Sequence, residues 1–422
     1  MRFKNLDQWL NWQITLHPKE IDLGLARVAG VWSRLKQTGL NSPVVTVAGT
    51  NGKGSSVAML ERIYLQAGYR VGAYTSPHLL RYNERIRVNG EAVSDSQLCQ
   101  AFDMIDRARE QTALTYFEFA TLAALLLFAE ACLDLIILEV GLGGRLDAVN
   151  IIDADVALIT TIDLDHTDWL GDNRELIGLE KAGIMRSNRP VVLADRDMPE
   201  SVLTYAGELA AKVYLANRDF HAHLAGTSWS WSLTNGPPRA LPLPKLSGEA
   251  QLTNASAVMM VCELLQSKLQ VNTEQLAEGL RQATLPGRLQ LIRGSPTLLL
   301  DVAHNSQSVA LMKHTLDQLD WPGEVYALFG LLQDKDAAAI VNILQPVVDH
   351  WFLLDLPGSR GQKAEQLVAK LYQAGVEVLV PCFQDFSSAF QAVRSAVQPQ
   401  DLVLIFGSFL IVGDALQYLA AE

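Results

Sequence analysis

The stretch Val44-Val45-Thr46-Val47-Ala48-Gly49-Thr50-Asn51-Gly52-Lys53-Gly54-Ser55-Ser56 carries the strongest local signal in this 422-residue chain. Its first five residues predict a buried strand, and the glycines that follow predict a tight turn into a helix that begins near Ser55. Such a turn points successive backbone N–H groups at one anion, and the helix N-terminus adds partial positive charge. Lys53 can reach the outer phosphates of a nucleotide, and Ser55 or Ser56 offers a hydroxyl to a phosphate-bound Mg²⁺.

Two positions of this loop depart from the general phosphate-binding pattern G-x-x-x-x-G-K-[ST]. Val47 stands where the first glycine would be, and Gly54 separates Lys53 from Ser55. A glycine-rich turn with an exposed lysine is the alternative interpretation. A strand, a glycine turn, a helix and a lysine in this order favour a nucleotide site, and the lysine argues against a dinucleotide-binding oxidoreductase, whose fingerprint uses none.

Outward from the loop, short apolar runs alternate with amphipathic segments of helix length. In the first series the predicted strands are Val44–Ala48, Val71–Tyr74, Leu135–Leu138, Val156–Thr160 and Val191–Leu193, and the predicted helices include Ser56–Gln66, Phe117–Glu130 and Arg174–Ala182. In the second series the predicted strands are Thr297–Leu300, Val325–Phe329, Trp351–Leu354, Val376–Val380 and Leu402–Phe406, and the predicted helices include Ala364–Gln373 and Phe386–Val397. Continuous apolar strands that alternate with helices are typical of parallel sheets covered on both faces.

The two series predict an α/β protein of two domains. We place a P-loop-type ATPase domain with a mainly parallel sheet at residues 1–288 and a smaller Rossmann-like α/β domain at residues 289–422. The segment Leu285-Pro286-Gly287-Arg288 between them suits a hinge or linker. The segment Trp229–Gly248 contains four prolines, which predicts irregular loop or edge structure.

Composition narrows the possible functions. Asp and Glu number 46 against 34 Lys and Arg, and the resulting formal charge of −12 argues against general nucleic-acid binding but not against a phosphate held by backbone dipoles. Four cysteines lie far apart without a CxxC pair, as in a reduced cytosolic protein. Met1–Glu20 has no apolar core of the signal-peptide kind, and the most apolar stretch, Phe119–Ala129, is too short to span a bilayer. We therefore expect a cytoplasmic protein.

Acidic side chains follow two of the predicted strands. Glu139 ends one of them, and Asp163, Asp165, His166 and Asp168 follow the next. Ligands gather outside the carboxyl ends of the strands of an open parallel sheet, so these residues suit a metal-proximal site. Carboxylates suit Mg²⁺, whereas His166 is a better ligand for Mn²⁺ or Zn²⁺. Ordinary strand-end, solvated or helix-capping roles are the alternatives.

Three other segments have local explanations that need no ligand. Lys181 lies in the last turn of a predicted helix, where a cation complements the helix dipole. Thr115-Tyr116-Phe117-Glu118 matches a capping box. Asp301 ends a strand of the second series and precedes Val302-Ala303-His304-Asn305, which suits either a ligand position or a helix cap.

Several segments together resemble one family. The chain contains, in order, TVAGTNGKGS (Thr46–Ser55), YTSPHLLR (Tyr74–Arg81), ILEVGLGGRLDAVN (Ile137–Asn150), TIDLDHTDWL (Thr161–Leu170), EKAGI (Glu180–Ile184), LPGRLQ (Leu285–Gln290), LDVAHN (Leu300–Asn305) and FGSF (Phe406–Phe409). These segments resemble folylpolyglutamate synthases, which belong to the Mur-ligase superfamily of ATP-dependent amide-forming enzymes. Ile21–Leu25 together with Thr115–Glu118 resembles the bifunctional bacterial type, which also makes dihydrofolate from dihydropteroate.

The resemblance implies a role for each matching residue. ATP would be bound by Thr50, Asn51, Gly52, Lys53, Gly54 and Ser55, and across a domain cleft by Asn254, Arg288 and Asp301. Two Mg²⁺ ions would be held by Ser55, Ser76, Glu139 and His166. The pterin-side pocket would be lined by Asp22, Leu23, Gly24, Leu25, Thr115, Tyr116, Phe117, Glu118, Leu146, Asp147 and Ala148. L-Glutamate would be seated by His304 and Ser408, and Lys181 would be carbamylated. The residues implied to be catalytic are Lys53, His166, Lys181, Asp301 and His304.

The implied reaction is the ATP-dependent addition of L-glutamate to dihydropteroate and to the γ-carboxylate of tetrahydrofolates through an acyl phosphate. Mg²⁺, Lys53 and backbone N–H groups would neutralise charge during phosphoryl transfer, and two closing domains would position the glutamate amine. The alternatives are a synthase restricted to folate polyglutamylation, a Mur-type ligase of peptidoglycan precursors, and a P-loop nucleotide switch that makes no covalent product. We expect a monomer that acts on small molecules and binds neither nucleic acid nor membranes.

Overall fold

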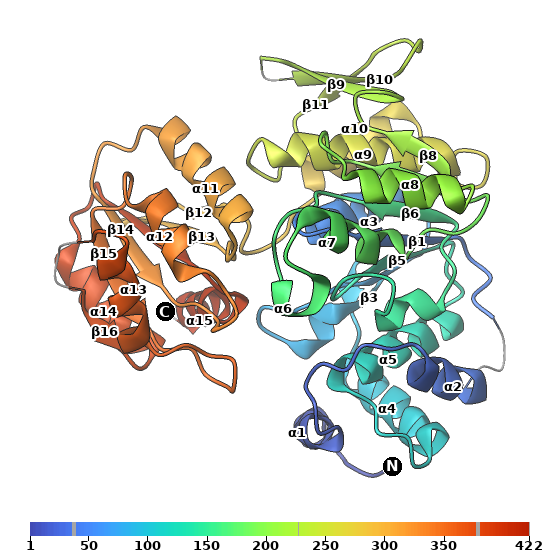
Figure 1. The fold of residues 1–422 in the computed structure, drawn as a ribbon, viewed down its shortest axis with the longest axis horizontal. Coiled ribbons are helices and arrows are strands. Elements are labelled where there is room, and N and C mark those ends of the chain that lie inside the picture. The colour runs from blue at the N-terminus through green and yellow to red at the C-terminus, as the bar shows by residue number, and fades with distance from the viewer. Residues whose placement is uncertain (36–38, 227, 377–379, 422) are drawn as a thin grey trace. The chain divides into compact units, whose positions relative to one another are not determined.

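The computed structural model describes residues 1–35, 39–226, 228–376 and 380–421, which form two compact units (Figure 1). The first unit comprises Met1–Asp163, Leu170–Lys245 and Gln251–Thr284. The second comprises Leu164–Trp169, Leu246–Ala250 and Leu285–Glu422. Each unit has its own sheet and its own hydrophobic core, so two short segments belong by their contacts to the second unit although the chain on either side belongs to the first.

Within the described residues, an eight-stranded sheet forms the centre of the first unit, in the order β4-β3-β2-β5-β1-β6-β7-β8. Its strands are β1 (Val44–Ala48), β2 (Val71–Tyr74), β3 (Ile86–Val88), β4 (Glu91–Ala92), β5 (Leu135–Glu139), β6 (Val156–Ile159), β7 (Pro190–Leu193) and β8 (Lys212–Leu215). Every neighbouring pair is parallel except β2–β3 and β3–β4, which confirms the expectation of a mainly parallel sheet.

The β3–β4 hairpin was missed by sequence analysis although its turn is a strong signal. Asn89 and Gly90 connect the two strands with φ of 54° and 83°. Positive φ at both positions is the requirement of the two-residue hairpin turn that Asn-Gly favours. The strands themselves are three and two residues long, too short to show a hydrophobic period.

Helices cover both faces of the eight-stranded sheet (Figure 1). The helices of the first unit are α1 (Leu6–Leu16), α2 (Ala26–Leu35), α3 (Lys53–Gln66), α4 (Asp95–Arg109), α5 (Tyr116–Glu130), α7 (Arg174–Ala182), α8 (Glu200–Glu208), α9 (Ala250–Leu265) and α10 (Thr273–Gln282), with the 3-10 turns η1 (Tyr82–Arg85) and η2 (Ala148–Ile151). Helix α3 packs on one face with α10 behind it, and α5 packs on the other with α4, α1 and α2 outside it. Every residue of α5 from Glu118 to Phe128 is buried, because this helix lies between the sheet and an outer helical layer.

The proline-rich segment Trp229–Gly248 is more regular than expected. It supplies most of a three-stranded antiparallel sheet of β9 (Phe220–Ala225), β10 (Ser228–Leu233) and β11 (Arg239–Pro242), in the order β11-β10-β9. The expectation of irregular loop was wrong for β10, where Trp229 and Trp231 alternate with serines and are each 1% exposed. The prolines lie in the turn after β10 and at the end of β11, which is an edge strand as expected.

The second unit contains a six-stranded sheet within the described residues, in the order β12-β13-β17-β14-β15-β16. Its strands are β12 (Gln290–Ile292), β13 (Thr297–Asp301), β14 (Val325–Phe329), β15 (His350–Leu354), β16 (Cys382–Phe383) and β17 (Leu402–Phe406). Its helices are α11 (Ser306–Leu319), α12 (Ala337–Leu344), α13 (Ala364–Gln373), α14 (Phe386–Ala396), α15 (Phe409–Ala421) and most of the short α6 (Thr167–Leu170). Only β12 runs antiparallel to its neighbour. The expected strand Val376–Val380 falls mainly on residues 377–379, which lie outside the described residues; β16 pairs with β15 instead. The α/β class is confirmed in both units.

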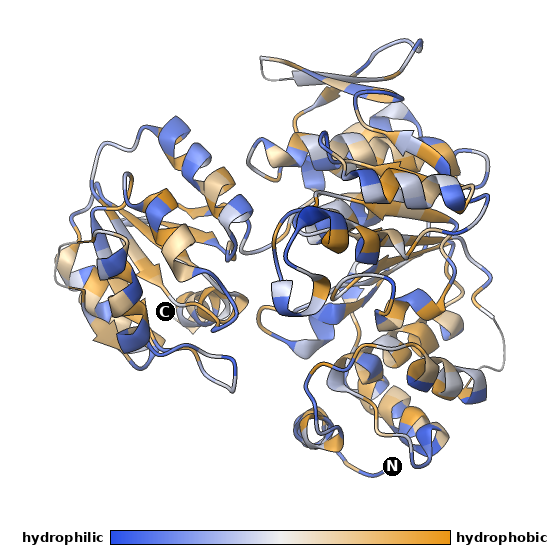
Figure 2. Cartoon of the chain, viewed as in Figure 1, coloured by the Kyte–Doolittle hydropathy of each residue, from blue (hydrophilic) through white to orange (hydrophobic). Residues whose placement is uncertain are grey.

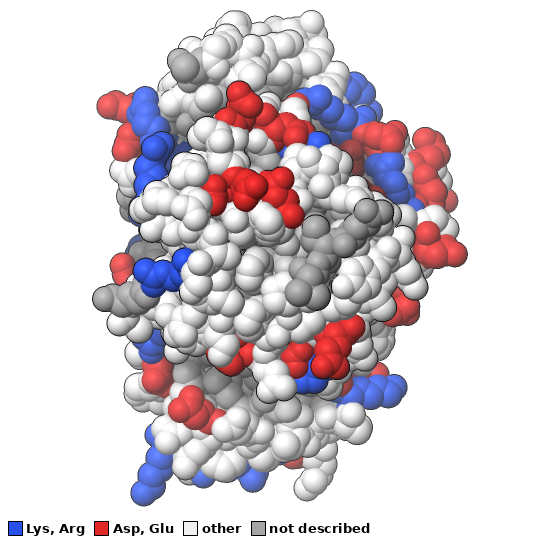
Figure 3. Space-filling view, turned by 90° about the vertical axis from the view of Figure 1, so that its left-hand side faces the viewer, with Lys and Arg blue, Asp and Glu red and all other residues white. Residues whose placement is uncertain are grey.

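Apolar residues are concentrated in the strands of both sheets (Figure 2), as the two cores require. On the face shown in Figure 3, acidic side chains gather in clusters while basic ones lie mostly toward its edges, in keeping with the formal charge of −12. None of the helices that the structure describes is both long and apolar enough to cross a membrane.

Candidate active site

The glycine loop joins β1 to α3 and is tied to the residues that follow β6. The Thr50 amide donates to the Thr161 carbonyl at 2.7 Å, and the Thr50 hydroxyl donates to the Asp163 carbonyl at 3.0 Å. The Thr160 hydroxyl donates to the Asn51 carbonyl at 2.7 Å. Strands β1 and β6 are adjacent, so the end of β6 fixes the path of the loop before the helix begins at Lys53, two residues earlier than expected.

Two glycines of the loop have no room for a side chain. Gly49 has φ of 148°, and a Cβ there would overlap the Thr160 hydroxyl. Gly52 has φ of 92° and caps α3, and a Cβ there would collide with the side chain of Asn254. Only glycine therefore fits these positions, and the contact places Asn254 of α9 beside the loop.

Lys53 and the two serines lie at the start of α3. The Lys53 ammonium donates to the carbonyls of Gly49 and Thr50 at 3.0 and 3.1 Å, so its side chain folds back along the loop. Ser55 is 3% exposed, and Ser56 is fully buried with a hydroxyl oxygen that has no hydrogen-bond partner. This geometry, with backbone N–H groups at a helix N-terminus beside a lysine, suits an anionic ligand.

Oxygen ligands for a divalent metal gather at the same edge of the sheet. Glu139 ends β5, is 5% exposed, and its carboxylate accepts the Ser76 amide at 3.2 Å. The Val140 amide donates to the Val47 carbonyl at 2.9 Å, which keeps the end of β5 next to the start of the glycine loop. Carboxylate and hydroxyl oxygens are the donors that Mg²⁺ prefers, so these residues fit that ion. No group of three or more His, Cys, Asp or Glu among the described residues is arranged to hold a metal.

The carboxylate of Asp147 holds the segment after Glu139 in a turn by accepting hydrogen bonds from its backbone. This buried side chain accepts the amides of Gly141, Leu142 and Val149 at 3.0, 2.9 and 3.0 Å. Burial raises the pKa of Asp147 to about 6, while these backbone bonds and nearby Lys53 oppose the rise. Asp147 therefore shapes the turn that carries Leu146 and Ala148.

Residues of that turn also form hydrogen bonds with the end of α7, where Lys181 lies. The Arg145 amide donates to the Glu180 carbonyl at 2.8 Å, and the Asn150 side chain donates to the Gly183 carbonyl at 3.0 Å. Lys181 is only 4% exposed, so it is not the solvated cation that simple pairing with the helix dipole would predict. A buried polar group needs specific partners, which makes this lysine a candidate for a site role.

The segment Thr115–Glu118 begins α5 with the expected capping box. The Glu118 amide donates to the Thr115 hydroxyl at 3.2 Å, and the Glu118 carboxylate accepts the Thr115 amide at 2.8 Å. The second carboxylate oxygen of Glu118 lies 3.2 Å from Arg27, whose guanidinium also pairs with Asp22. Arg27 thus joins the early loop to α5, a link that sequence analysis missed.

Phe117 connects this region to the turn held by Asp147. A Cβ at Gly141 would meet the Phe117 ring at 2.6 Å and the Asp147 carboxylate at 3.3 Å, and Phe117 packs against Tyr74 with ring centroids 6.0 Å apart. The structure therefore brings together the three segments that the sequence assigned to one pocket, namely Asp22–Leu25, Thr115–Glu118 and Leu146–Ala148.

In the second unit, Asp165 is the centre of a cluster of polar side chains. Its carboxylate forms an ion pair with Lys335, accepts the Asn305 amide at 3.1 Å and lies 3.6 Å from His304. Asp165 is buried, which alone would raise its pKa, but the bond from His304 and the surrounding cations hold the pKa well below its usual range. Lys335 is also buried and was missed by sequence analysis, although the charged run Asp334-Lys335-Asp336 shortly after β14 was a signal at a strand end.

His166 lies beside this cluster in a left-handed backbone conformation, with φ of 53°. Its ring nitrogens are 3.9 Å from Asp334 and 4.0 Å from Asp165. Burial lowers the pKa of His166 to about 4, so the imidazole is neutral at pH 7 and keeps a lone pair for a metal. The structure places His166 in the second unit, whereas Ser55, Ser76 and Glu139 belong to the first.

The other predicted residues of the second unit have local hydrogen bonds. Asp301 ends β13 and its carboxylate accepts the amides of Leu289 and Ala303, both at 2.7 Å. Burial raises the pKa of Asp301, and the nearby Arg288 guanidinium opposes this. The Ser408 hydroxyl accepts the Leu410 amide at 3.1 Å at the start of α15, so each side chain has a structural role besides any ligand.

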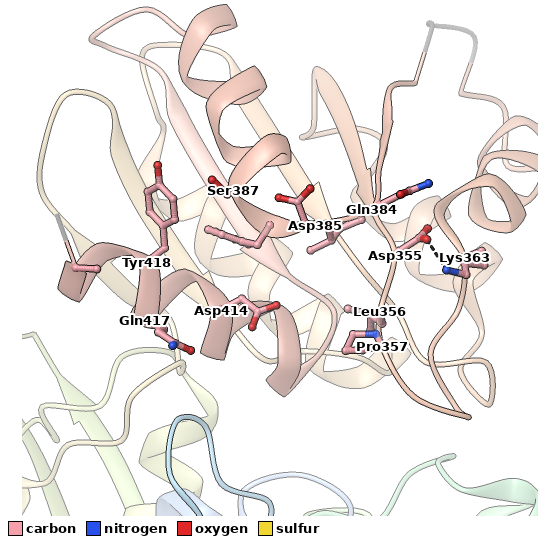
Figure 4. Close-up of a pocket in the computed structure, with 13 residues that line it drawn as sticks. Asp355, Leu356, Pro357, Lys363, Gln384, Asp385, Ser387, Asp414, Gln417 and Tyr418 are labelled. Carbon is pink, nitrogen blue, oxygen red and sulfur yellow. Dashed lines mark hydrogen bonds and ion pairs between the residues drawn. The ribbon is translucent and has the colours of Figure 1, made fainter.

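A hollow of about 640 Å³ in the second unit is lined by residues from the end of β15, the start of α14 and α15 (Figure 4). Two of its three acidic side chains are engaged: Asp355 pairs with Lys363 at 2.7 Å, and Asp385 caps α14 by accepting the Ser388 amide at 2.9 Å. None of the residues predicted for the active site lines it.

Known proteins share this arrangement over nearly the whole chain. Residues 47–262 match the Mur ligase middle domain, and residues 287–409 match the Mur ligase glutamate ligase domain. The dihydrofolate synthase/folylpolyglutamate synthase of Escherichia coli is 42% identical over 420 residues, which cover 99% of this chain and 96% of the relative.

Solved structures agree with these sequence matches. The structure of Escherichia coli FolC in complex with DHPP and ADP superposes with a TM-score of 0.92 at 41% identity, covering 99% of this chain and 98% of that one. A bifunctional folylpolyglutamate synthase/dihydrofolate synthase with Mn, AMPPNP and L-glutamate bound has a TM-score of 0.89 at 41% identity and the same coverage. With a nucleotide-type glycine loop, two Mur ligase domains and full-length relatives, the chain belongs to the dihydrofolate synthase/folylpolyglutamate synthase family.

Proposed function

We propose that the chain is an ATP-dependent ligase that joins L-glutamate to dihydropteroate, giving dihydrofolate, and to the γ-carboxylate of tetrahydrofolates. The observation that carries the proposal is the glycine loop with Lys53, set beside Ser76 and Glu139, in a chain 42% identical over 420 residues to a bifunctional synthase. Relatives of this chain have been solved with ADP, with AMPPNP and Mn, and with L-glutamate, so ATP and a divalent metal are its expected cofactors.

In this proposal the ATP phosphates bind at the start of α3. The backbone of Thr50, Asn51, Gly52, Gly54 and Ser55 cradles them, Lys53 turns from the loop carbonyls to the outer phosphates, and Asn254 lies beside Gly52. In the second unit, Arg288 and Asp301 are assigned to ATP. Stabilising the transferring phosphoryl group is the main task of such a site, because two anions must approach each other.

We assign two Mg²⁺ ions to Ser55, Ser76, Glu139 and His166. Metal bound there would neutralise phosphate charge as a Lewis acid. Glu139 supplies a buried carboxylate and His166 a neutral imidazole, while Ser55 and Ser76 supply hydroxyls.

Lys181 is assigned a carbamylated side chain, which would turn a buried cation into an anionic partner for the metal. Replacing Lys181 with Ala should abolish ligation, and short carboxylates or high bicarbonate should restore part of it if they fill the vacated space. Mass spectrometry of the intact protein kept at neutral pH provides a direct check. An unmodified lysine in fully active protein would contradict the assignment.

The acyl substrate is assigned to the pocket formed by Asp22–Leu25, Thr115–Glu118 and Leu146–Ala148. The aromatic ring of Phe117 offers a stacking surface, and the turn held by Asp147 closes around it. The incoming L-glutamate is assigned to His304 and Ser408 of the second unit. The substrate carboxylate is first phosphorylated, and the neutral α-amine of glutamate then displaces phosphate, which makes the second step mainly a problem of positioning.

The test is phosphate release from ATP with Mg²⁺ and L-glutamate, with dihydropteroate and tetrahydrofolate supplied in parallel reactions. Glutamate-dependent release with both substrates is expected. Release with tetrahydrofolate alone would restrict the enzyme to polyglutamylation. No release with either substrate, from folded protein that still binds ATP, would contradict the proposal and direct attention to peptidoglycan precursors.

A further inference from the structure

A buried arginine in the first unit, Arg85, has no acidic partner among the residues that the structure describes. Arg85 ends the turn η1, is 8% exposed, and its guanidinium lies 5.4 Å from the centre of the Tyr82 ring and 5.5 Å from that of Tyr116. Its Nε donates to Nδ1 of His78 at 2.9 Å. Within the part of the chain that the structure describes, no Asp or Glu forms an ion pair with it. Burying a charge without an opposite charge costs folding free energy. The unpaired Arg85 guanidinium therefore indicates that an anionic ligand binds there.

His78 does not serve as the missing counter-ion. Its Nδ1 accepts the bond from the Arg85 Nε, and an imidazole that accepts at this nitrogen is neutral and carries no negative charge. Tyr82 and Tyr116 contribute only ring faces, and burial raises the pKa of both phenols, which keeps them neutral as well. The positive charge of Arg85 therefore faces neutral groups.

Arg109 in the same unit is a buried arginine with a structural role, and its partners can be compared with those of Arg85. It is also 8% exposed and also lies over an aromatic ring, with its guanidinium 5.1 Å from the centre of Trp12. Unlike Arg85, it bonds the Asp106 carboxylate at 2.9 Å and the Thr112 carbonyl at 3.1 Å. Of these two equally buried arginines that lie over aromatic rings, Arg109 has a carboxylate partner and Arg85 has none among the described residues.

The position of Arg85 indicates which anion is missing. Its carbonyl accepts the Thr75 amide at 2.9 Å, so it adjoins Ser76, which is bonded to Glu139 on the metal side of the site. Its guanidinium contacts Tyr116, which belongs to the Thr115–Glu118 segment of the acyl-substrate pocket. The Arg85 backbone therefore adjoins the segment that carries Ser76, and its guanidinium lies beside the segment assigned to the acyl substrate.

We propose that Arg85 binds the carboxylate of the acyl substrate and holds it for phosphorylation, an inference that rests on the proposed function. A planar guanidinium matches a carboxylate with two parallel hydrogen bonds and remains charged at every working pH. It also supplies the positive charge that an anionic carboxylate needs as it meets the phosphates of ATP. Arg85 recognises the acid group itself, whereas the pocket recognises the ring system.

The test compares binding of dihydropteroate with that of its carboxamide analogue, in which a neutral amide replaces the carboxylate. Both are titrated against the full chain with Mg²⁺ and a non-hydrolysable ATP analogue. The unsubstituted protein should prefer the acid by about tenfold or more, the scale of a charge-assisted bidentate contact. In Arg85→Gln the preference should disappear while affinity for the carboxamide stays within about twofold, and Arg85→Lys should keep part of the preference.

Arg109→Gln is the matched control. It should lower the thermal midpoint, because it breaks the buried pair with Asp106 and the bond to the Thr112 carbonyl, yet keep the full preference for the acid. Arg85→Gln should have a midpoint no lower than the parent, because it removes an uncompensated buried charge. An unchanged acid-to-amide ratio in Arg85→Gln overturns the assignment even if turnover falls. Absence of phosphate release with dihydropteroate from the unsubstituted protein would instead contradict the proposed function, and this inference with it.

Discussion

The glycine loop of the first unit and the Asp165 cluster of the second are built in opposite ways. The loop is a continuous segment from Gly49 to Ser55, and its geometry comes from backbone bonds, positive φ at glycines and the start of α3. The Asp165 cluster gathers side chains from three distant segments, and its ion pair with Lys335 joins residues 170 positions apart. Only the glycine loop is encoded by one continuous stretch of sequence. Substitutions in the loop and in the Asp165 cluster are therefore expected to affect different properties of the protein.

The largest effect on stability is expected from the ion pair of the second unit. Lys335→Met should destabilise the chain by about 3–5 kcal/mol, because it leaves Asp165 as a buried carboxylate without its cation. Urea unfolding of the full chain measures this change. The double variant Lys335→Met/Asp165→Asn should recover much of the loss.

Lys313→Met is the matched control for that variant. Lys313 pairs with Asp317 at 2.7 Å in the same unit, but their side chains are 29% and 45% exposed. Its removal should cost less than about 1 kcal/mol, as for surface pairs in general. Equal losses from the two lysine variants would show that the Asp165 cluster does not organise the second unit.

In the glycine loop, the largest effect should fall on activity and not on stability. Lys53→Ala should reduce ligation by about 100- to 1,000-fold, the range for removing one group that stabilises transition-state charge. The fold should persist, since the Lys53 ammonium bonds the carbonyls of Gly49 and Thr50, whereas the path of the loop is set by Thr160 and Thr161. Phosphate release and circular dichroism measure the two properties. Near-normal turnover in a folded variant would remove Lys53 from the site.

A smaller effect on stability is expected from two glycine substitutions, which distinguish the strain of a positive φ from a collision with a neighbouring side chain. Gly52→Ala combines a positive φ of 92° with a collision against Asn254, whereas Gly68→Ala has a similar φ of 85° and open space around it. Gly68→Ala should cost about 1–2 kcal/mol of stability, the strain of a left-handed residue, and leave the Michaelis constant for ATP unchanged. Gly52→Ala should cost more and raise that constant. Identical behaviour of the two variants would show that the loop tolerates a side chain beside Asn254.

The sequence predicted what is encoded locally. Buried strands at Val44–Ala48 and Leu402–Phe406, the capping box at Thr115–Glu118 and the end of α7 at Ala182 all lie within one or two residues of their expected positions. Runs of apolar residues and capping side chains determine these features through neighbours in the chain. The prolines that follow Ser228–Leu233 predicted a loop, whereas the alternation of tryptophan and serine within this segment is the pattern of the strand that forms.

The residues that the sequence did not reveal act through distant contacts. Arg27 binds Asp22 and Glu118, Lys335 binds Asp165, and Arg85 lies beside the rings of Tyr82 and Tyr116. The sequence neighbours of Arg27 and Arg85 do not distinguish them from surface cations, and the charged run around Lys335 marks only a position after a strand, because each role depends on burial that the fold creates.

The central claim is that amide formation proceeds through an acyl phosphate. Its most direct test follows an oxygen atom from the substrate carboxylate into the released phosphate. Dihydropteroate labelled with ¹⁸O in its carboxylate is converted with ATP, Mg²⁺ and L-glutamate, and the released phosphate is examined by mass spectrometry. An acyl-phosphate ligase transfers one labelled oxygen to phosphate for each amide formed, and this is the expected result. Amide formation with unlabelled phosphate, or ATP cleavage without amide, would contradict the account.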